Sequence, residues 1–349
     1  MKKHLYLLFL IKILNGYSQN PIVPPGTFIS DPSAHVWKEG KMYVYGSRDE
    51  SLKYYCSLSY RLLSSSDLNK WDLSDVSFFN KANGTEVSFM DDLLLAPDVQ
   101  YHNGKYYLYY YMFNFVNAEW VAESNSPTGP FTNNHPIYTK KINQIDPCVF
   151  IDDDGQGYYI WGQFNAKIAK LKTNMTEIDT TTLKENIVTQ KEHYFHEGAL
   201  VKRKRLYYLI YSDMSRAGRP TCLGYATSRS PMGPFKYQGV IIDNNNSDPV
   251  TWNNHGSLVE FKDKWHVFYH RATNGSISMR KAPLEPIPFR EDGTIPEAEM
   301  TLQGAAPPLN AFEEIDAARA CLVIGNIRIK TFSDNNEGLA NIQSNGYRL

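Results

Sequence analysis

The chain has 349 residues, which is long enough to bury a substantial hydrophobic core. Its 36 Lys and Arg residues balance 37 Asp and Glu residues, and a formal net charge of -1 argues against a nucleic-acid partner, because phosphate binding needs a surplus of basic groups. The four cysteines have no C-x-x-C spacing, which argues against a zinc site and a dense disulfide scaffold. We expect buried free thiols and leave one disulfide open among Cys56, Cys148, Cys222 and Cys321.

The N-terminal segment, residues 1–18, has the features of an export signal. Lys2 and Lys3 precede an apolar run at residues 5–11, and small residues lead to a plausible cleavage site after Ser18. The apolar run is too short to span a bilayer. We therefore expect a secreted or periplasmic protein that has no membrane anchor.

Five related β-hairpins follow one another between residues 25 and 303. In each, a short apolar run and a turn precede a second strand that is rich in aromatic residues. No stretch longer than a turn or two has helical periodicity. Radial closure of four-stranded sheets protects the strand edges of such a repeat, so we predict an all-β, five-bladed β-propeller. The aromatic strands cover residues 41–45, 105–109, 157–161, 206–210 and 264–268.

The composition changes after the repeats. Residues 305–309 resemble a linker, and residues 310–349 lose the tyrosine-rich pattern. These last residues are too few for an independent hydrophobic core. We expect a short C-terminal β extension that either packs on the propeller or begins a further module.

An ionisable residue recurs once per repeat, at the start of the first strand. In a propeller these strands line the central channel, so we expect the five residues to meet at one mouth. Carboxyl groups that share a desolvated funnel repel one another, which separates their pKa values and yields an acid and a base. Hydrolysis of a glycosidic bond requires such a pair. The residues are Asp31, Asp98, Asp146, Glu197 and His255.

Structural roles compete with these functional ones. Asp-Pro steps such as Asp31-Pro32 are common in turns. The run of residues 152–155 resembles a calcium loop but lacks its further acidic ligands, which favours a solvated hairpin turn. His255 fits a hydrogen-bonding core residue as well as an indirect metal ligand.

Around these residues the sequence resembles glycoside hydrolase family 43, over residues 25 to about 303. Six short motifs carry the resemblance, spread over all five repeats. They are Ser30-Asp31-Pro32-Ser33, Ala96-Pro97-Asp98, Ile145-Asp146-Pro147, Glu197-Gly198, His255-Gly256-Ser257 and Tyr269-His270-Arg271.

The resemblance implies a role for each matched residue. Asp31 would be the general base and Glu197 the general acid. Asp146 would orient the acid and tune its pKa. Asp98 would be a substrate-binding or supporting carboxylate, and Arg271 would contact the sugar.

The resemblance also implies the reaction and its requirements. The mechanism would be a single displacement with inversion, since the N-D-P-N and E-C-P motifs of the retaining invertase-like propellers are absent. The chemistry would need no cofactor, but the family's histidine at the position of His255 often lies beside a calcium ion, so a structural calcium ion in the channel stays open. We expect a monomer that acts on an oligosaccharide or polysaccharide.

Three functional alternatives follow. The first is an α-L-arabinofuranosidase or β-xylosidase that acts on arabinoxylan or arabinan. The second is a catalytically silent, carbohydrate-binding propeller. The third is another enzyme on the same scaffold, such as an exo-galactanase, an endo-acting arabinanase or xylanase, or a glycoside phosphorylase. In the tail, residues 312–349 resemble the opening of a family 6 carbohydrate-binding module.

Overall fold

The computed structural model describes most of the chain as β-structure. The described residues are 20–74, 93–113, 119–139, 145–216, 218–308, 312, 316–323 and 325–342. The expected export signal at residues 1–18 lies outside them. Within the described ranges, no helix has the length and apolar character needed to cross a membrane. All four cysteines are free thiols, as expected, and Cys321 is the one that is only half-buried.

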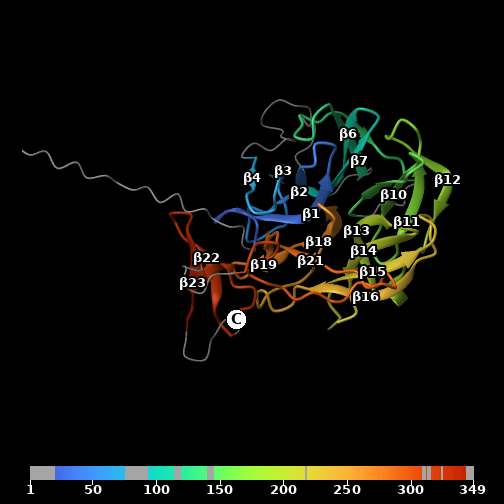
Figure 1. Ribbon diagram of the computed structural model, residues 1–349. Helices are drawn as coiled ribbons and strands as arrows, with labels where there is room; N and C mark the ends of the chain where they lie inside the picture. The colour runs from blue at the N-terminus through green and yellow to red at the C-terminus, as the bar shows by residue number, and fades with distance from the viewer. Residues whose placement is uncertain are drawn as a thin grey trace, which may run out of the picture.

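Five antiparallel sheets follow one another around the molecule, which confirms the predicted five-bladed propeller (Figure 1). Blade 1 contains β1 (Ile29–Val36), β2 (Met42–Arg48), β3 (Tyr60–Ser65) and β4 (Asp72–Leu73). Blade 2 contains β5 (Leu94–His102), β6 (Lys105–Met112), β7 (Glu119–Ser124) and β8 (Thr132–Pro136). Blade 3 contains β9 (Cys148–Ile151), β10 (Gly157–Trp161), β11 (Lys167–Leu171) and β12 (Ile178–Lys184).

The last two blades and the tail complete the described strands. Blade 4 contains β13 (Tyr194–Arg203), β14 (Leu206–Asp213), β15 (Cys222–Ser228) and β16 (Lys236–Asp243). Blade 5 contains β17 (Gly256–Phe261), β18 (Lys264–Tyr269) and β21 (Leu284–Ile287), and it carries an inserted hairpin of β19 (Arg271–Thr273) and β20 (Ser276–Lys281). The tail forms a hairpin of β22 (Arg328–Thr331) and β23 (Glu337–Ala340).

The first strand of every blade lies at the centre of the molecule. Strand β1 neighbours β5 and β17, β9 neighbours β5 and β13, and β13 neighbours β17, so the five strands close a ring. The residues at which these strands begin therefore surround one mouth of the channel, and the residues at which they end surround the other.

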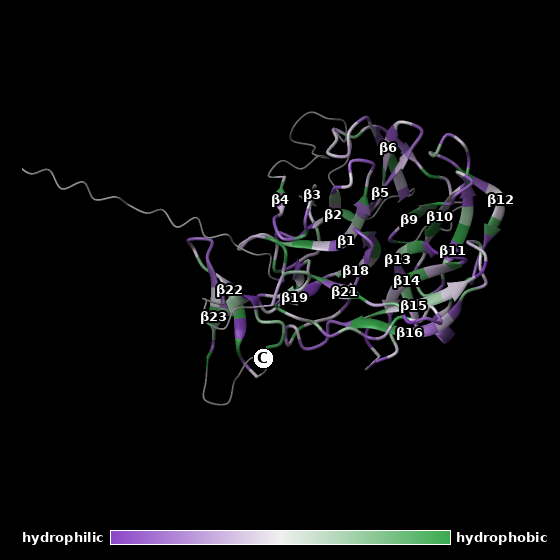
Figure 2. Cartoon of the chain, viewed as in Figure 1, coloured by the Kyte–Doolittle hydropathy of each residue, from purple (hydrophilic) through white to green (hydrophobic). Residues whose placement is uncertain are grey.

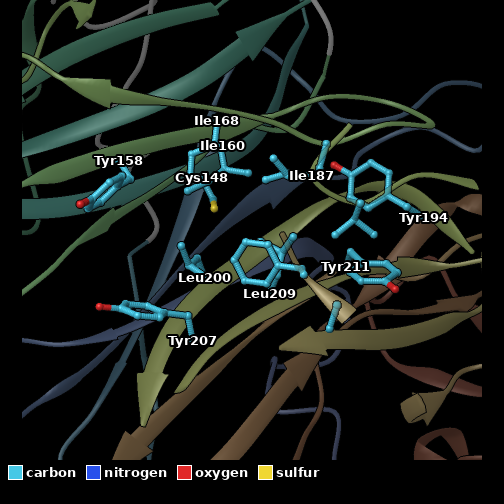
Figure 3. Close-up of a cluster of buried hydrophobic side chains, with 14 residues drawn as sticks. Cys148, Tyr158, Ile160, Ile168, Ile187, Tyr194, Leu200, Tyr207, Leu209 and Tyr211 are labelled. Atoms are coloured by element: carbon cyan, nitrogen blue, oxygen red, sulfur yellow. The ribbon is translucent and has the colours of Figure 1, made fainter. Parts of the chain in front are cut away.

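Paired tyrosines on the second strands of blades 2, 3 and 4 hold neighbouring blades together. Adjacent residues of a strand point to opposite faces, so each ring of a Tyr-Tyr pair packs against a different neighbouring blade. Tyr207 packs in the cluster between blades 3 and 4 (Figure 3), and Tyr208 packs in the cluster between blades 4 and 5. The second strands are accordingly buried on both faces, and Figure 2 shows patches of hydrophobic and hydrophilic residues along the strands of the propeller. Because each buried aromatic ring removes about 150–250 Å² from water, these pairs are a major source of blade-to-blade stability.

The N-terminal segment ties blade 1 to blade 5. The backbone N–H of Ile22 donates to the Ala282 carbonyl at 2.9 Å, and the backbone N–H of Asn20 donates to the Leu302 carbonyl at 2.8 Å. The Asn20 side chain also donates to the Leu284 carbonyl. The two ends of the propeller are thus joined by hydrogen bonds.

Candidate active site

A cavity of about 170 Å³ lies at the mouth where the inner strands begin. Asp31, Asp146, His196 and Arg280 line it together with several aromatic side chains. A larger cavity of about 390 Å³ is lined by residues from the far ends of the same strands, so it belongs to the opposite mouth. The smaller cavity is the candidate active site because it holds the clustered ionisable groups.

Asp31 is buried in this cavity as an ionised carboxylate. Its Oδ1 atom lies 3.0 Å from Nη1 of Arg280. Burial alone would raise the pKa of Asp31, but Arg280 and the neighbouring histidines lower it well below its usual value. The group is therefore negatively charged at neutral pH, as a general base must be.

Arg280 is fixed by a second carboxylate. Its Nε and Nη2 atoms donate to Asp49 at 2.8 and 2.9 Å, and its backbone N–H donates to Asp49 at 3.0 Å. A fork of this kind sets both the position and the plane of the guanidinium. Asp49 thus orients the cation that keeps Asp31 ionised.

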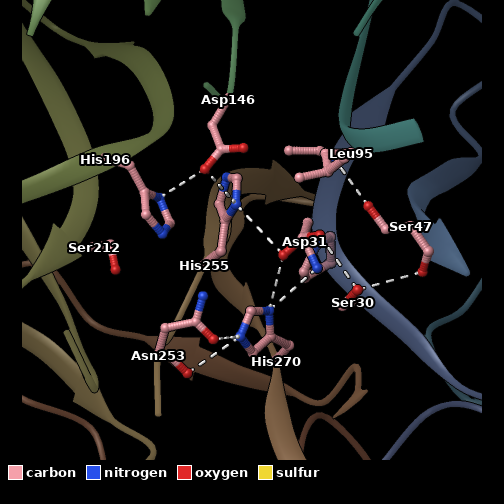
Figure 4. A network of polar contacts seen from close by, with 12 residues as sticks. Ser30, Asp31, Ser47, Leu95, Asp146, His196, Ser212, Asn253, His255 and His270 are labelled. Carbon is pink, nitrogen blue, oxygen red and sulfur yellow. Dashed lines mark hydrogen bonds and ion pairs between the residues drawn. The ribbon is translucent and has the colours of Figure 1, made fainter. Parts of the chain in front are cut away.

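His270 orients Asp31 from the other side (Figure 4). Its Nδ1 accepts the backbone N–H of Asp31 at 3.2 Å, and its Nε2 lies 3.2 Å from the Asn253 carbonyl oxygen. Burial lowers the pKa of His270 to about 4, so the imidazole is neutral at physiological pH. Nδ1 also lies 3.2 Å from Asp31 Oδ1. A proton on Nδ1 would serve this carboxylate, and a proton on Nε2 would serve the Asn253 carbonyl.

Asp146 faces Asp31 across the imidazole of His255, and His196 lies beside Asp146 (Figure 4). His196 Nδ1 lies 3.0 Å from Asp146 Oδ2, and His255 Nδ1 lies 3.6 Å from Asp31 Oδ1 and 3.8 Å from Asp146 Oδ2. Burial lowers the pKa of His196, but Asp146 outweighs this effect and raises it overall. The two aspartates have φ angles of 51° and 60°, a left-handed conformation at both Asp-Pro steps.

Glu197 occupies a different environment from the two aspartates. It is fully buried, with Oε1 at 3.6 Å from Cys148 Sγ and Oε2 at 3.4 Å from the Tyr194 hydroxyl. Burial raises its pKa to about 8, so the carboxyl group is protonated at neutral pH. It does not line the cavity, whereas the preceding residue, His196, does. Strand β13 bulges on both sides of this pair, which alters the alternation of its side chains.

Two glycines allow the inner strands to approach at this mouth. A Cβ atom on Gly256 would lie 1.9 Å from the Phe268 carbonyl oxygen, and a Cβ atom on Gly198 would lie 2.8 Å from the Gly256 carbonyl oxygen. The glycines that follow Glu197 and His255 are therefore required by packing.

Asp98 was expected at the same mouth of the channel as Asp31, but it lies further along the channel. Asp98 pairs with Tyr109 just as Ser33 pairs with Tyr45, so Ala96 occupies the position that corresponds to Asp31. Asp98 accepts hydrogen bonds from the Ser33 hydroxyl at 2.7 Å and the Val149 backbone N–H at 2.6 Å, and it lines the larger cavity. The proline precedes this aspartate instead of following it, and the carboxylate is displaced along the channel.

Arg271 also lies away from the cavity that was expected to bind the sugar. It is 3% exposed, and its Nη2 atom donates to the Arg319 carbonyl at 3.0 Å. Arg280, which pairs with Ala272 on the opposite strand of the same hairpin, is the arginine that lines the cavity. Arg280 is therefore the arginine of this hairpin that is placed to contact a sugar in the cavity.

The cavity has an aromatic rim. Trp252 is 39% exposed and Phe164 is 42% exposed, and both rings pack edge-on against Phe195. Exposed rings beside a polar cavity offer a flat apolar surface to the faces of a sugar ring.

A group of three residues could hold a metal ion. Asp146, His196 and His255 offer ligand atoms within 4.8 Å of one another. Calcium prefers six to eight oxygen ligands, whereas two imidazoles with one carboxylate suit a transition metal better. These residues do not fit direct calcium coordination, so a calcium ion here would have to retain most of its water.

Comparison with known proteins identifies related sequences. Residues 18–295 match the sequence profile of glycosyl hydrolases family 43. The chain is 31% identical to a xylosidase/arabinosidase of Thermoclostridium stercorarium, over 86% of this chain and 71% of that protein. It is 27% identical to a xylosidase/arabinosidase of Bacteroides ovatus, over 80% of this chain and 96% of that protein.

Solved structures share the fold. A β-xylosidase/α-arabinofuranosidase from a compost microbial metagenome, crystallised with xylotriose in a calcium-free form, aligns with a TM-score of 0.68 and 26% identity, covering 81% of this chain and 98% of that one. An arabinoxylan arabinofuranohydrolase of Bacillus subtilis, in complex with cellotetraose, also aligns with a TM-score of 0.68 and 26% identity, covering 95% of this chain and 79% of that one.

Proposed function

Because the chain belongs to glycosyl hydrolase family 43 and is a glycosidase, we propose that it releases α-L-arabinofuranosyl or β-D-xylosyl units from arabinoxylan or arabinan. The observation that carries this proposal is the small cavity at one mouth, in which an ionised carboxylate lies beside an arginine and an aromatic rim. Relatives named xylosidase/arabinosidase and a related structure that holds xylotriose support the choice of pentosides.

Asp31 acts as the general base in the proposed reaction. Its carboxylate takes a proton from a water molecule as the water oxygen bonds to the anomeric carbon. The bond from that carbon to the leaving oxygen breaks in the same step, and the configuration inverts. His270 accepts the backbone N–H of Asp31, and Arg280 holds the carboxylate in place and keeps it ionised.

Glu197 gives its proton to the leaving oxygen. Its raised pKa keeps the proton on the carboxyl group at neutral pH. The proposal requires the side chain to turn from Cys148 and Tyr194 toward the cavity when substrate binds. Catalytic hydrogen bonds often form fully only in the substrate complex, so the buried position in the free enzyme is compatible with this role. Asp146 orients the acid and tunes its pKa, and Asp98 supports the channel wall.

The pKa values of the two groups predict a broad plateau of activity. The base must be ionised, so activity is lost only as the pH falls through the lowered pKa of Asp31. The acid must be protonated, so activity is lost as the pH rises through about 8, the pKa of Glu197. The expected kcat/KM profile is flat from acidic pH to about 8. Initial rates on an aryl pentoside across this range test it, and an alkaline limb well below neutral pH would contradict the assignment of Glu197.

Replacing Arg280 by methionine should move the acid limb of this pH profile to higher pH. Without the cation beside it, Asp31 protonates at higher pH, so the base is lost earlier as the pH falls. The variant also leaves Asp49 buried without its partner, which costs about 3–5 kcal/mol of folding free energy. Adding Asp49→Asn removes that unpaired charge and serves as the stability control. An unchanged acid limb in a folded variant would show that Arg280 does not govern Asp31.

A panel of nitrophenyl α-L-arabinofuranoside, β-D-xyloside and β-D-galactoside tests the function itself. We expect hydrolysis of one or both pentosides, and proton NMR should show that the first product has the inverted anomeric configuration. A silent carbohydrate-binding propeller would hydrolyse none of them, and a galactanase would prefer the third.

The remaining properties are proposed from the sequence. Residues 1–18 direct export, residues 25–303 form the catalytic propeller and residues 310–349 form the C-terminal extension. The enzyme acts as a monomer, and its chemistry needs no cofactor. His255 contacts any channel calcium ion through water.

A further inference from the structure

The C-terminal extension packs against the hairpin that carries Arg280. Asn274, in the turn between β19 and β20, donates to the Thr331 hydroxyl at 2.9 Å, and Lys281 forms an ion pair with Glu337. Arg319 donates to the Pro21 carbonyl at 2.7 Å, which connects the tail to the N-terminal segment as well. The described part of the tail is therefore joined to the propeller at several points beside the active site.

Neighbouring residues of β20 connect the two sides of this hairpin. Side chains of adjacent strand residues point to opposite faces. Arg280 extends inward to Asp31 and Asp49, and Lys281 extends outward to Glu337. The side chains of Lys281 and Glu337 are 5% and 4% exposed, so the outer pair is nearly as buried as the inner one.

Glu337 lies among three cations on the outer face, Arg271, Lys281 and Arg319. Arg271 and Lys281 are direct cross-strand partners, and like charges in such positions destabilise a sheet. Arg271 donates to the Arg319 carbonyl, so the tail supplies an acceptor for one cation and a carboxylate for the other. Burial lowers the pKa of Lys281, and Glu337 counteracts this effect. Glu285 of blade 5 also faces Arg271, whereas the carboxylate that pairs with Lys281 comes from the tail.

We propose that Glu337 is a positioning residue of the active site. It holds Lys281, and through β20 it fixes the guanidinium of Arg280 against Asp31. The inference rests on the proposed role of Asp31 as the general base. In this proposal the C-terminal extension is part of the catalytic domain and stabilises the wall of the cavity. This role does not depend on the resemblance of residues 312–349 to a carbohydrate-binding module.

The variant Glu337→Gln tests the proposal because it removes the charge and keeps the shape. We expect kcat/KM on an aryl pentoside to fall about ten- to hundredfold, since small displacements of a positioned group have effects of this size. The acid limb of the pH profile should move to higher pH, because Arg280 is held less closely to Asp31. Glu337→Asp should restore part of the activity. Asp334→Asn, in the exposed turn of the same hairpin, is the matched control and should leave both readouts unchanged.

Hydrogen exchange of the peptide that spans residues 271–281 gives a readout that needs no catalysis. Glu337→Gln should accelerate exchange there, and Asp334→Asn should not. If Glu337→Gln changed neither the hydrogen exchange of residues 271–281 nor the acid limb of the pH profile, the proposal would be overturned. If the wild-type enzyme hydrolysed none of the pentosides, the proposed function would fail and the exchange data would still decide whether Glu337 braces the hairpin. A Glu337→Gln variant that merely melts earlier, with both readouts intact, would also reject positioning.

Discussion

Replacing Glu197 by glutamine is expected to lower kcat by about two to four orders of magnitude on substrates with poor leaving groups. Glutamine keeps the size of the side chain and can keep its contacts with Cys148 and Tyr194, so the fold should persist. It cannot give a proton to the leaving oxygen. The loss should therefore shrink as the leaving group becomes more acidic, and a dinitrophenyl pentoside should be hydrolysed far better than an alkyl one.

Glu285 provides a matched control for this variant. It is also a buried glutamate with a raised pKa, about 7, but it lies on β21 of blade 5 and contacts Asn20 and Thr301, away from the cavity. Glu285→Gln should change the melting temperature at most and leave kcat near that of the wild type. Near-normal activity of Glu197→Gln on an alkyl pentoside would remove Glu197 from the role of acid. The next residue to replace would then be His196, which lines the cavity from the preceding position.

Local sequence patterns were enough to predict the fold. The tyrosine pairs of blades 2 to 4 recur because the second strand of a blade lies between two neighbouring blades and presents a ring to each, as Tyr207 and Tyr208 do. In blade 1, β2 instead presents tyrosines to one side and aliphatic residues to the other. This requirement is local to each strand and repeats with the blade, so it is visible without any knowledge of long-range contacts. The number and order of the blades follow from it.

The positions of Asp31 and Asp146 could be predicted for a similar reason. Each starts a first strand and precedes a proline, and the ring of first strands brings the two residues to one cavity. Asp98 also adjoins a proline, but there the proline precedes the aspartate instead of following it. A displacement of two residues along a strand preserves the face but moves the side chain by roughly 7 Å, since a strand rises about 3.3 Å per residue. That displacement is enough to place Asp98 in the other cavity.

The partners of Asp31 could not be identified in this way. Arg280 and Asp49 are 231 residues apart in sequence and form a buried ion pair that no local pattern reveals. Asp49 lies in an Arg-Asp-Glu run that resembles ordinary solvated charge, and Arg280 adjoins another basic residue, Lys281. Only the inserted hairpin in blade 5 brings these residues together. Its signal in the sequence is the extra length between Tyr269 and Leu284.

The structure separates the two proposed catalytic carboxyl groups by environment as well as by position. Asp31 is buried beside a cation and stays ionised, whereas Glu197 is buried among a thiol, a phenol and apolar side chains and stays protonated. Two carboxyl groups with opposite pKa shifts are what acid–base hydrolysis of a glycosidic bond requires. The separation originates in blade contacts that the aromatic repeat alone does not specify.

Asp31→Asn should be as damaging as the loss of the acid, with kcat lowered by about two to four orders of magnitude. Asparagine is close in size to aspartate and can keep the contact of its backbone N–H with His270, so the fold should persist. It cannot take a proton from water. Because water activation limits every substrate equally, the variant should stay slow even on a dinitrophenyl pentoside, which distinguishes it from Glu197→Gln. Initial rates on a series of leaving groups measure this difference.

Azide offers a second test of the same variant. Azide is already an anion and attacks without giving up a proton, so it should restore partial turnover to Asp31→Asn and give a glycosyl azide of inverted configuration. Asp213→Asn is the matched control, because Asp213 is a fully buried aspartate at the end of β14 that does not line the cavity. It should keep its activity and show no response to azide. Two results together would show that the base is another residue: no rescue by azide, and hydrolysis by Asp31→Asn that becomes fast on substrates with good leaving groups. Asp146, the other aspartate of this cavity, would then be the residue to test.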